Sequence, residues 1–150
     1  MHNMTKIYLD TCSIQRPLDT LSQTRLRLEA EAILGVLTQV KAGNVELISS
    51  TVLELETQRN PLVIRREHGE QILAQATSIV IVDEQIEERA RYFVPVGIKI
   101  MDALHLAAAE AAGADYFCTC DDRFLRRAKA VAGLQTRVVS PLELIEAIEE

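Results

Sequence analysis

The chain has 150 residues, of which 48% are hydrophobic and 25% charged, with only six glycines and four prolines. This composition excludes collagen-like, mucin-like and low-complexity chains, and it predicts one globular domain over residues 1–150. The three cysteines are an odd number, which argues against a disulfide framework and favours a reducing cytoplasm. The formal charge of −6 excludes a protein that coats nucleic acid by its overall charge, but it does not exclude an enzyme that acts on nucleic acid.

The N-terminal sequence MHNMTKIYLD contains an aspartate at position 10 and no long apolar core behind a basic start, so it does not match a secretory signal. No apolar run approaches the roughly 20 residues that span a bilayer. We therefore expect a soluble, cytoplasmic protein with no membrane partner.

Apolar spacing predicts strands that alternate with helices. A short strand over residues 6–10 ends on an aspartate, and apolar side chains three and four apart then predict a helix from about Ser22 to Gly43. The next strand, at 45–48, leads into a helix that opens with the capping-box pattern Thr51-Val-Leu-Glu54 and closes at Pro61. Further along, the pattern predicts helices over 62–76, 83–94, 98–112 and 124–131 and from Pro141, and strands over 79–82, 115–119 and 137–139.

The order of these elements predicts the fold class. Strands separated by helices, with no hairpin signals, favour a mainly parallel sheet of four to five strands with helices on both faces. The unbroken branched run at 79–82 is typical of a strand that is covered on both faces. In such sheets, ligands bind beyond the carboxyl ends of the strands, where the strand order reverses.

Two predicted strands end in acidic residues. Asp10 follows the first strand, and Asp121 and Asp122 follow the fourth. Aspartate is also a common turn and cap residue, so one such position means little. If the first and fourth strands are neighbours at the switch point, however, their carboxylates converge on one crevice and repel each other unless a cation or a proton intervenes.

Two helices offer further carboxylates. Asp102 interrupts the apolar segment KIMDALHLA, where it borders the buried face of the helix, although a first-turn aspartate is also favourable for the helix dipole. In the helix after the second strand, Glu54 and Glu56 are both available. Because Glu54 is the third helical position of the predicted capping box, we prefer Glu56 as the ligand and keep Glu54 as the substitute.

Three or four carboxylates around one pocket, without Cys/His zinc spacing, describe a site for Mg²⁺ or Mn²⁺. The reaction that suits such a site is phosphodiester hydrolysis, because the cation activates a water and stabilises the charge of the transition state. The chain has no glycine-rich phosphate loop for hydrolysis of a nucleoside triphosphate.

The same motifs, in this order, resemble the PIN-domain nucleases, including the VapC-like toxins of bacterial toxin–antitoxin pairs. IYLDT resembles the opening strand of that family, ISSTVLELE its strand-to-helix segment, KIMDALHLA its most distinctive segment and TCDDRF its closing T-x-D element. The resemblance implies that the metal and its nucleophilic water are held by Asp10, Glu56, Asp102 and Asp121, and that supporting roles fall to Thr11, Ser50, Thr119 and Asp122.

The resemblance also implies a three-layer α/β/α, Rossmann-like fold and a metal-dependent endoribonuclease. It implies a homodimer as well, whose activity a cognate antitoxin blocks. The chain departs from the family at Cys12, where many relatives carry asparagine. A thiol is a softer group than Mg²⁺ prefers, so Cys12 either packs as a small side chain or alters the water network around Asp10.

Other chemically active side chains have structural interpretations. His105 lies three residues beyond Asp102 and suits a hydrogen bond within the helix packing, or else a metal. Cys118 and Cys120 form a metal pair with Cys12 or, as we prefer, are buried small side chains. Among 12 arginines, Arg123 is the best candidate for contact with RNA phosphate, because it directly follows the acidic pair.

Two alternatives compete with the nuclease. The first is a phosphatase that uses Asp10 as a covalent nucleophile, but that chemistry wants a second acid at the position of Cys12. The second is a catalytically silent PIN-like module that serves only as an assembly partner. Metal-dependent cleavage of RNA separates the enzyme from the module.

Overall fold

The computed structural model describes residues 4–149. Its centre is a five-stranded sheet in which every neighbouring pair is parallel, in the order β3-β2-β1-β4-β5. The predicted α/β fold with a parallel sheet is therefore confirmed. The strands are β1 (Lys6–Leu9), β2 (Glu46–Ser50), β3 (Ser78–Val80), β4 (Tyr116–Cys118) and β5 (Arg137–Val139).

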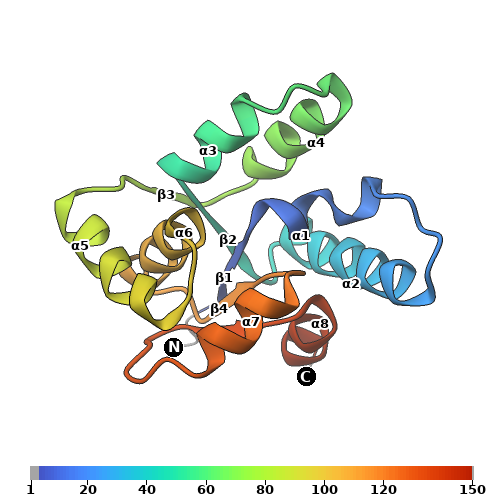
Figure 1. Ribbon diagram of the computed structural model, residues 1–150. Coiled ribbons are helices and arrows are strands. Elements are labelled where there is room, and N and C mark those ends of the chain that lie inside the picture. The colour runs from blue at the N-terminus through green and yellow to red at the C-terminus, as the bar shows by residue number, and fades with distance from the viewer. Residues whose placement is uncertain (1–3, 150) are drawn as a thin grey trace.

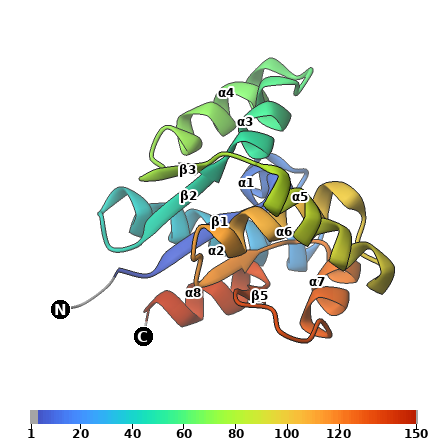
Figure 2. The same ribbon diagram turned by 90° about the vertical axis from the view of Figure 1, so that its left-hand side faces the viewer.

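Helices cover both faces of the sheet and so complete three layers (Figure 1). One layer contains α5 and α6, the other contains α2 and α8, and α3 and α4 form a helical pair on the β3 side of the sheet (Figure 2). The helices are α1 (Thr11–Gln15), α2 (Thr24–Lys41), α3 (Thr51–Gln58), α4 (Val63–Leu73), α5 (Glu84–Phe93), α6 (Ile100–Ala111), α7 (Asp122–Lys129) and α8 (Pro141–Glu149), with 3-10 turns η1 (Arg16–Leu18) and η2 (Val94–Val96).

The core sits on both sides of the central strand. Ile7, Tyr8 and Leu9 of β1 are completely buried, which is the pattern of a parallel strand with a helical layer on each face. The rings of Tyr8 and Phe117 stack across β1 and β4 with their centroids 5.2 Å apart. Residues next to the carboxyl end of β1 are therefore held on a rigid base.

The predicted switch point is confirmed. From β1 the chain adds β2 and then β3 on one side, and β4 then pairs with the other side of β1. Leu9 is in register with Cys118, and the N–H of Asp10 donates to the carbonyl of Cys118 at 3.2 Å. The residues that follow these two strands consequently share one edge of the sheet.

Two local predictions are wrong. The run predicted at 79–82 as a strand covered on both faces overlaps the edge strand β3, in which Ile79 is 55% exposed, and Ile81, just after the strand, is 74% exposed. An apolar run looks the same in a buried strand and an exposed edge, because strand order is set by tertiary contacts. The predicted Thr51 cap is also one residue late: Ser50 is the N-cap of α3, and its hydroxyl accepts from the N–H of Leu53 at 3.1 Å.

Helix α1 was not predicted, because five residues are too few to show helical periodicity. Its one signal is Asp10, whose carboxylate caps the helix by accepting from the N–H of Ser13. Among residues 4–149, no helix is long and apolar enough to cross a membrane.

Candidate active site

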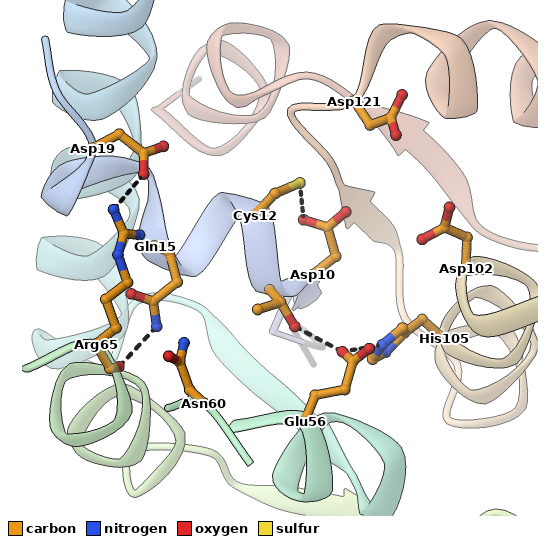
Figure 3. Close-up of a pocket in the computed structure, with 11 residues that line it drawn as sticks. Asp10, Cys12, Gln15, Asp19, Glu56, Asn60, Arg65, Asp102, His105 and Asp121 are labelled. Carbon is orange, nitrogen blue, oxygen red and sulfur yellow. Dashed lines mark hydrogen bonds and ion pairs between the residues drawn. The ribbon is translucent and has the colours of Figure 1, made fainter. Parts of the chain in front are cut away.

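A cavity of about 480 Å³ opens at the carboxyl edge of the sheet. All four carboxylates that the sequence predicts as metal ligands line it, and Figure 3 shows Asp10, Asp102 and Asp121 facing the space between them, with Glu56 beside His105. The elements that supply them are distant in sequence: the end of β1, α3, α6 and the segment after β4. The fold thus gathers four acids that the chain keeps apart.

Asp10 is the most deeply placed of these acids. It is 6% exposed, and its Oδ1 accepts hydrogen bonds from the N–H of Ser13 at 3.0 Å and from the thiol of Cys12 at 3.1 Å. Burial raises the pKa of Asp10 well above its usual range, because a buried carboxylate has lost its hydration. The hydrogen bonds to Asp10 therefore do not offset the cost of burying its negative charge.

Glu56 is held by two side chains from other elements. Its Oε1 accepts from the hydroxyl of Thr11 at 2.8 Å and lies 2.6 Å from Nε2 of His105. Burial pushes the pKa of Glu56 upward, but the hydrogen bonds from His105 and Thr11 outweigh it and leave the pKa below its ordinary value. Both contacts fall on the same oxygen, and within residues 4–149 no hydrogen bond or ion pair engages Oε2.

Asp102 and Asp121 form another wall of the cavity. Asp121 caps α7 by accepting from the N–H of Phe124 at 3.1 Å, and its own N–H donates to the hydroxyl of Thr119 at 3.1 Å. Asp102 lies half-buried in the first turn of α6. Burial and then the negative charge of Asp121 raise the pKa of Asp102, so the two carboxylates repel each other.

The supporting residues are placed differently from one another. The hydroxyl of Thr11 donates to Glu56, and the hydroxyl of Thr119 accepts from the backbone N–H of Asp121. Ser50 lies behind the cavity wall, where it caps α3 and contacts the hydroxyl of Tyr8. Asp122 does not line the cavity, because it is exposed and forms an ion pair with Arg25 of α2.

The three cysteines lie close to the start of α1, where Asp10 caps the helix. Cys118 and Cys120 are free and buried, as the preferred interpretation predicted. Cys12 is partly exposed and lines the cavity, with its thiol directed at Asp10, as Figure 3 shows. The side chain of Cys120 and then burial raise the pKa of Cys12, so Cys12 stands beside Asp10 as a neutral donor.

On the opposite wall of the cavity, Gln15, Asp19 and Asn60 were not predicted, whereas Arg65 is one of the arginines expected near the mouth of the crevice. Gln15 of α1 donates to the carbonyl of Arg65 in α4, and the guanidinium of Arg65 pairs with Asp19 at 2.8 Å (Figure 3). Asn60 completes this wall. These residues follow no strand end and carry no local pattern, so only the packing of α1 against α4 brings them to the site.

A smaller cavity of about 110 Å³ adjoins the first and shares Asp102 and Asp121 with it. Lys99 and Arg123 also line it, so cationic side chains stand directly beside the acids. Arg123, the predicted contact for RNA phosphate, is thus placed beside the acidic cavity.

The donor set fits a hard divalent cation in chemistry. Carboxylate oxygens are the ligands that Mg²⁺ and Mn²⁺ prefer, and a cation would relieve both the burial of Asp10 and the repulsion between Asp102 and Asp121. Within the described range 4–149, however, no three His, Cys, Asp or Glu side chains are already close enough to hold an ion. Binding one ion by several of these acids therefore requires side-chain movement.

Comparisons with known proteins agree with this architecture. A family model described as the PIN domain matches residues 7–130. The crystal structure of FitAcB from Neisseria gonorrhoeae has a TM-score of 0.57 and 20% identity over 91% of this chain and 98% of that chain. A structure of FitAB bound to an IR36 DNA fragment gives 0.59 and 20%, over 90% and 94%.

A third structure is VapC20 of Mycobacterium tuberculosis, described as a sarcin-ricin loop cleaving toxin. It gives a TM-score of 0.54 and 16% identity over 86% of this chain and 98% of that chain. At these identities the three structures show a shared fold. No curated protein sequence is significantly similar to the chain.

Proposed function

Because the chain belongs to the PIN domain family, a family of nucleases, we propose that it is a Mg²⁺- or Mn²⁺-dependent endoribonuclease formed by one nuclease domain. The observation that carries this proposal is the convergence of Asp10, Glu56, Asp102 and Asp121 on one cavity at the switch point of the sheet. Burial of Asp10 and the repulsion between Asp102 and Asp121 disfavour their negative charges, and both effects suit the cavity to a positive ion.

In this proposal the four carboxylates hold the cation, and the surrounding residues keep the carboxylates in place. When bound, the cation supplies a water of lowered pKa and stabilises negative charge on the phosphate. Asp10 and Asp121 are each fixed by a backbone N–H at a helix start, which limits their rotamers. Glu56 is fixed by Thr11 and His105 through one oxygen and presents the other.

The approach of RNA depends on local cations rather than on the overall charge. The formal charge is −6, and without the four site carboxylates it would be −2, so the rest of the chain attracts RNA weakly. Lys99 and Arg123 line the adjoining cavity beside Asp102 and Asp121, so their positive charges are available to a phosphate of bound RNA. We assign Arg123 to substrate binding on this basis.

The proposed protein partners of this chain are suggested by the proteins that share its fold. FitAB was solved bound to DNA, and VapC20 is described as a toxin. We propose that this chain is likewise the toxin of a toxin–antitoxin pair, that it forms a homodimer, and that a cognate antitoxin blocks the acidic cavity.

The proposal is tested by incubating the purified chain with a mixed panel of RNAs in Mg²⁺, in Mn²⁺ and in EDTA. We expect cleavage that requires a divalent cation and disappears in Asp102→Asn. Glu110→Gln, in the same helix but outside the cavity, controls for general damage to α6. Intact RNA, together with no cation binding by calorimetry, would instead favour the silent interaction module.

The toxin assignment has a separate test. Induced expression of the wild-type chain in bacteria should slow growth, whereas Asp10→Ala should not. Equal growth of the two strains would refute the toxin assignment while leaving the in vitro nuclease test unaffected.

A further inference from the structure

A continuous line of hydrogen bonds runs from the core of the protein to Glu56. The hydroxyl of Ser50 lies 2.7 Å from the hydroxyl of Tyr8, which lies 2.6 Å from Nδ1 of His105. Nε2 of the same imidazole lies 2.6 Å from Oε1 of Glu56. Ser50 and Tyr8 are fully buried and His105 is 3% exposed, so the protein itself supplies these contacts in place of water.

The direction of donation along this line follows from its cavity end when the imidazole of His105 is neutral. At the core end, the hydroxyl oxygen of Ser50 accepts from the N–H of Leu53, and its hydrogen is available to Tyr8. At the cavity end, an ionised Glu56 only accepts, so Nε2 of His105 carries a hydrogen. Tyr8 then accepts from Ser50 and donates to a lone pair on Nδ1, and every member is satisfied.

The phenol is suited to this role because it stays neutral. Burial raises the pKa of Tyr8 above its ordinary value, so its hydroxyl keeps a hydrogen to donate. Its ring is fixed by stacking on Phe117 and by an edge contact with the ring of His105 at a centroid distance of 5.8 Å. The hydroxyl is therefore presented to Nδ1 from a rigid base.

We propose that Tyr8 and His105 are positioning residues that hold Glu56 in its ligand orientation: Tyr8 fixes the tautomer of His105, and His105 then fixes one oxygen of the carboxylate. The other oxygen makes no hydrogen bond or ion pair with residues 4–149 and would be available to a cation. The loss of the Tyr8 hydroxyl would free the imidazole to turn its lone pair toward Glu56, which repels a carboxylate. The catalytic consequence of this arrangement rests on the nuclease function proposed above, but the arrangement itself does not.

The arrangement is tested first in the unaltered protein. Nitrogen-15 NMR of histidine-labelled wild-type chain at pH 8 distinguishes the two neutral tautomers and the imidazolium. We expect His105 as the neutral form with hydrogen on Nε2 and an unprotonated Nδ1. Hydrogen on Nδ1, alone or in the imidazolium, would overturn the proposal, and this measurement needs no variant that has to fold.

The second test removes only the hydroxyl. Tyr8→Phe keeps the ring that stacks on Phe117, and Tyr116→Phe is a matched control on the neighbouring strand, outside the cavity. We expect Tyr8→Phe to change the His105 nitrogen signals and to weaken Mn²⁺ binding, measured by calorimetry without RNA, by about tenfold. For RNA cleavage we expect kcat to fall by a similar factor with little change in KM, because Tyr8 does not touch substrate.

The outcomes separate this proposal from the nuclease proposal. A Tyr8→Phe protein with unchanged His105 signals and unchanged Mn²⁺ affinity would overturn the positioning role even if RNA is cleaved normally. Conversely, the wild-type chain could show the predicted tautomer and cleave no RNA, while Tyr8→Phe shows the predicted loss of Mn²⁺ affinity. That result would support the positioning role and refute the nuclease.

Discussion

Glu54 and Glu56 lie two positions apart in α3, yet only Glu56 lines the acidic cavity. The carboxylate of Glu54 accepts a hydrogen bond from the hydroxyl of Ser49 at 2.9 Å on the β2 side. Glu56 instead meets Thr11 and His105 at the cavity wall. Glu54 and Glu56 have different environments because α3 begins directly after its N-cap Ser50. The position of this start determines which way each glutamate side chain points from the helix.

Because only Glu56 lines the cavity, replacing Glu56 or Glu54 by glutamine should have different consequences. Glu56→Gln removes a ligand charge from the cavity, and we expect RNA cleavage to fall by about 100-fold or more. Glu54→Gln keeps an acceptor for Ser49, and we expect near-normal cleavage, with a loss of stability below about 1 kcal/mol. Single-turnover cleavage assays and chemical denaturation measure both effects. Equal losses of cleavage in the two variants would contradict the assignment of Glu56.

The buried charge of Asp10 predicts a stability effect. The pKa of Asp10 is raised in the folded state, so above that pKa the folded protein carries the cost of an unfavourable charge that the unfolded chain does not. Asp10→Asn removes this cost and keeps an oxygen that accepts from Ser13. At pH 8 without divalent cations we expect its Tm to rise by about 2–4 °C for each kcal/mol recovered.

Added divalent cations should raise the Tm of the wild type above that of Asp10→Asn. Mg²⁺ or Mn²⁺ binds only the folded wild type and raises its Tm with concentration, whereas Asp10→Asn should respond weakly. Differential scanning calorimetry of both proteins, with added metal and with EDTA, measures these Tm values. A wild-type Tm that does not change with either metal would count against a cation at this site.

The start of α8 predicts a pH-dependent contribution to stability. Glu143 accepts from the N–H of Ser140 at 3.0 Å and pairs with Lys129 at 2.9 Å, which confirms the capping box predicted at 140–143. Burial pushes the pKa of Glu143 upward, but Ser140 and Lys129 outweigh it and lower the pKa. Because the folded pKa is below the unfolded one, the carboxylate stabilises the fold at neutral pH, and this contribution is lost as the pH falls through the folded pKa.

Glu143→Gln should therefore destabilise the protein at pH 7 by about 0.5–1 kcal/mol, an estimate already reduced for the partial exposure of the pair. The difference from wild type should shrink as the pH falls below about 4.3, the ordinary pKa of glutamate. Urea denaturation from pH 7 to pH 3 measures it. Glu146→Gln, exposed on the same helix, should show no comparable trend.

Much of the fold could be predicted from the sequence, because most of its helices and strands show their apolar spacing and end signals within their own residues. Alternating strands and helices predict a parallel sheet, and acids at the ends of β1 and β4 predict where the site lies. The exposed edge strand at Ile79 was mistaken for a buried one, because strand order depends on contacts made elsewhere in the chain.

The parts of the site that escaped prediction are those that only tertiary packing creates. Tyr8 lies 97 residues from His105 in sequence, and an apolar strand gives no sign that its hydroxyl meets an imidazole. Likewise, Gln15 lines the cavity from α1, a helix that the sequence did not predict. Acids that follow strand ends can be predicted from one sequence, whereas the contact between Tyr8 and His105 cannot.

Arg123 lies in the smaller cavity beside Asp102 and Asp121, which predicts a role in RNA binding rather than in chemistry. Arg123→Gln removes one charge-assisted contact to phosphate, so we expect KM for RNA to rise by about tenfold while kcat changes little. The dependence of log KM on log salt concentration should also become shallower by about one charge. Arg91→Gln removes an exposed arginine of α5 that pairs with Glu87, and it should alter neither quantity. A fall in kcat at unchanged KM in Arg123→Gln would show instead that this guanidinium acts on the transition state.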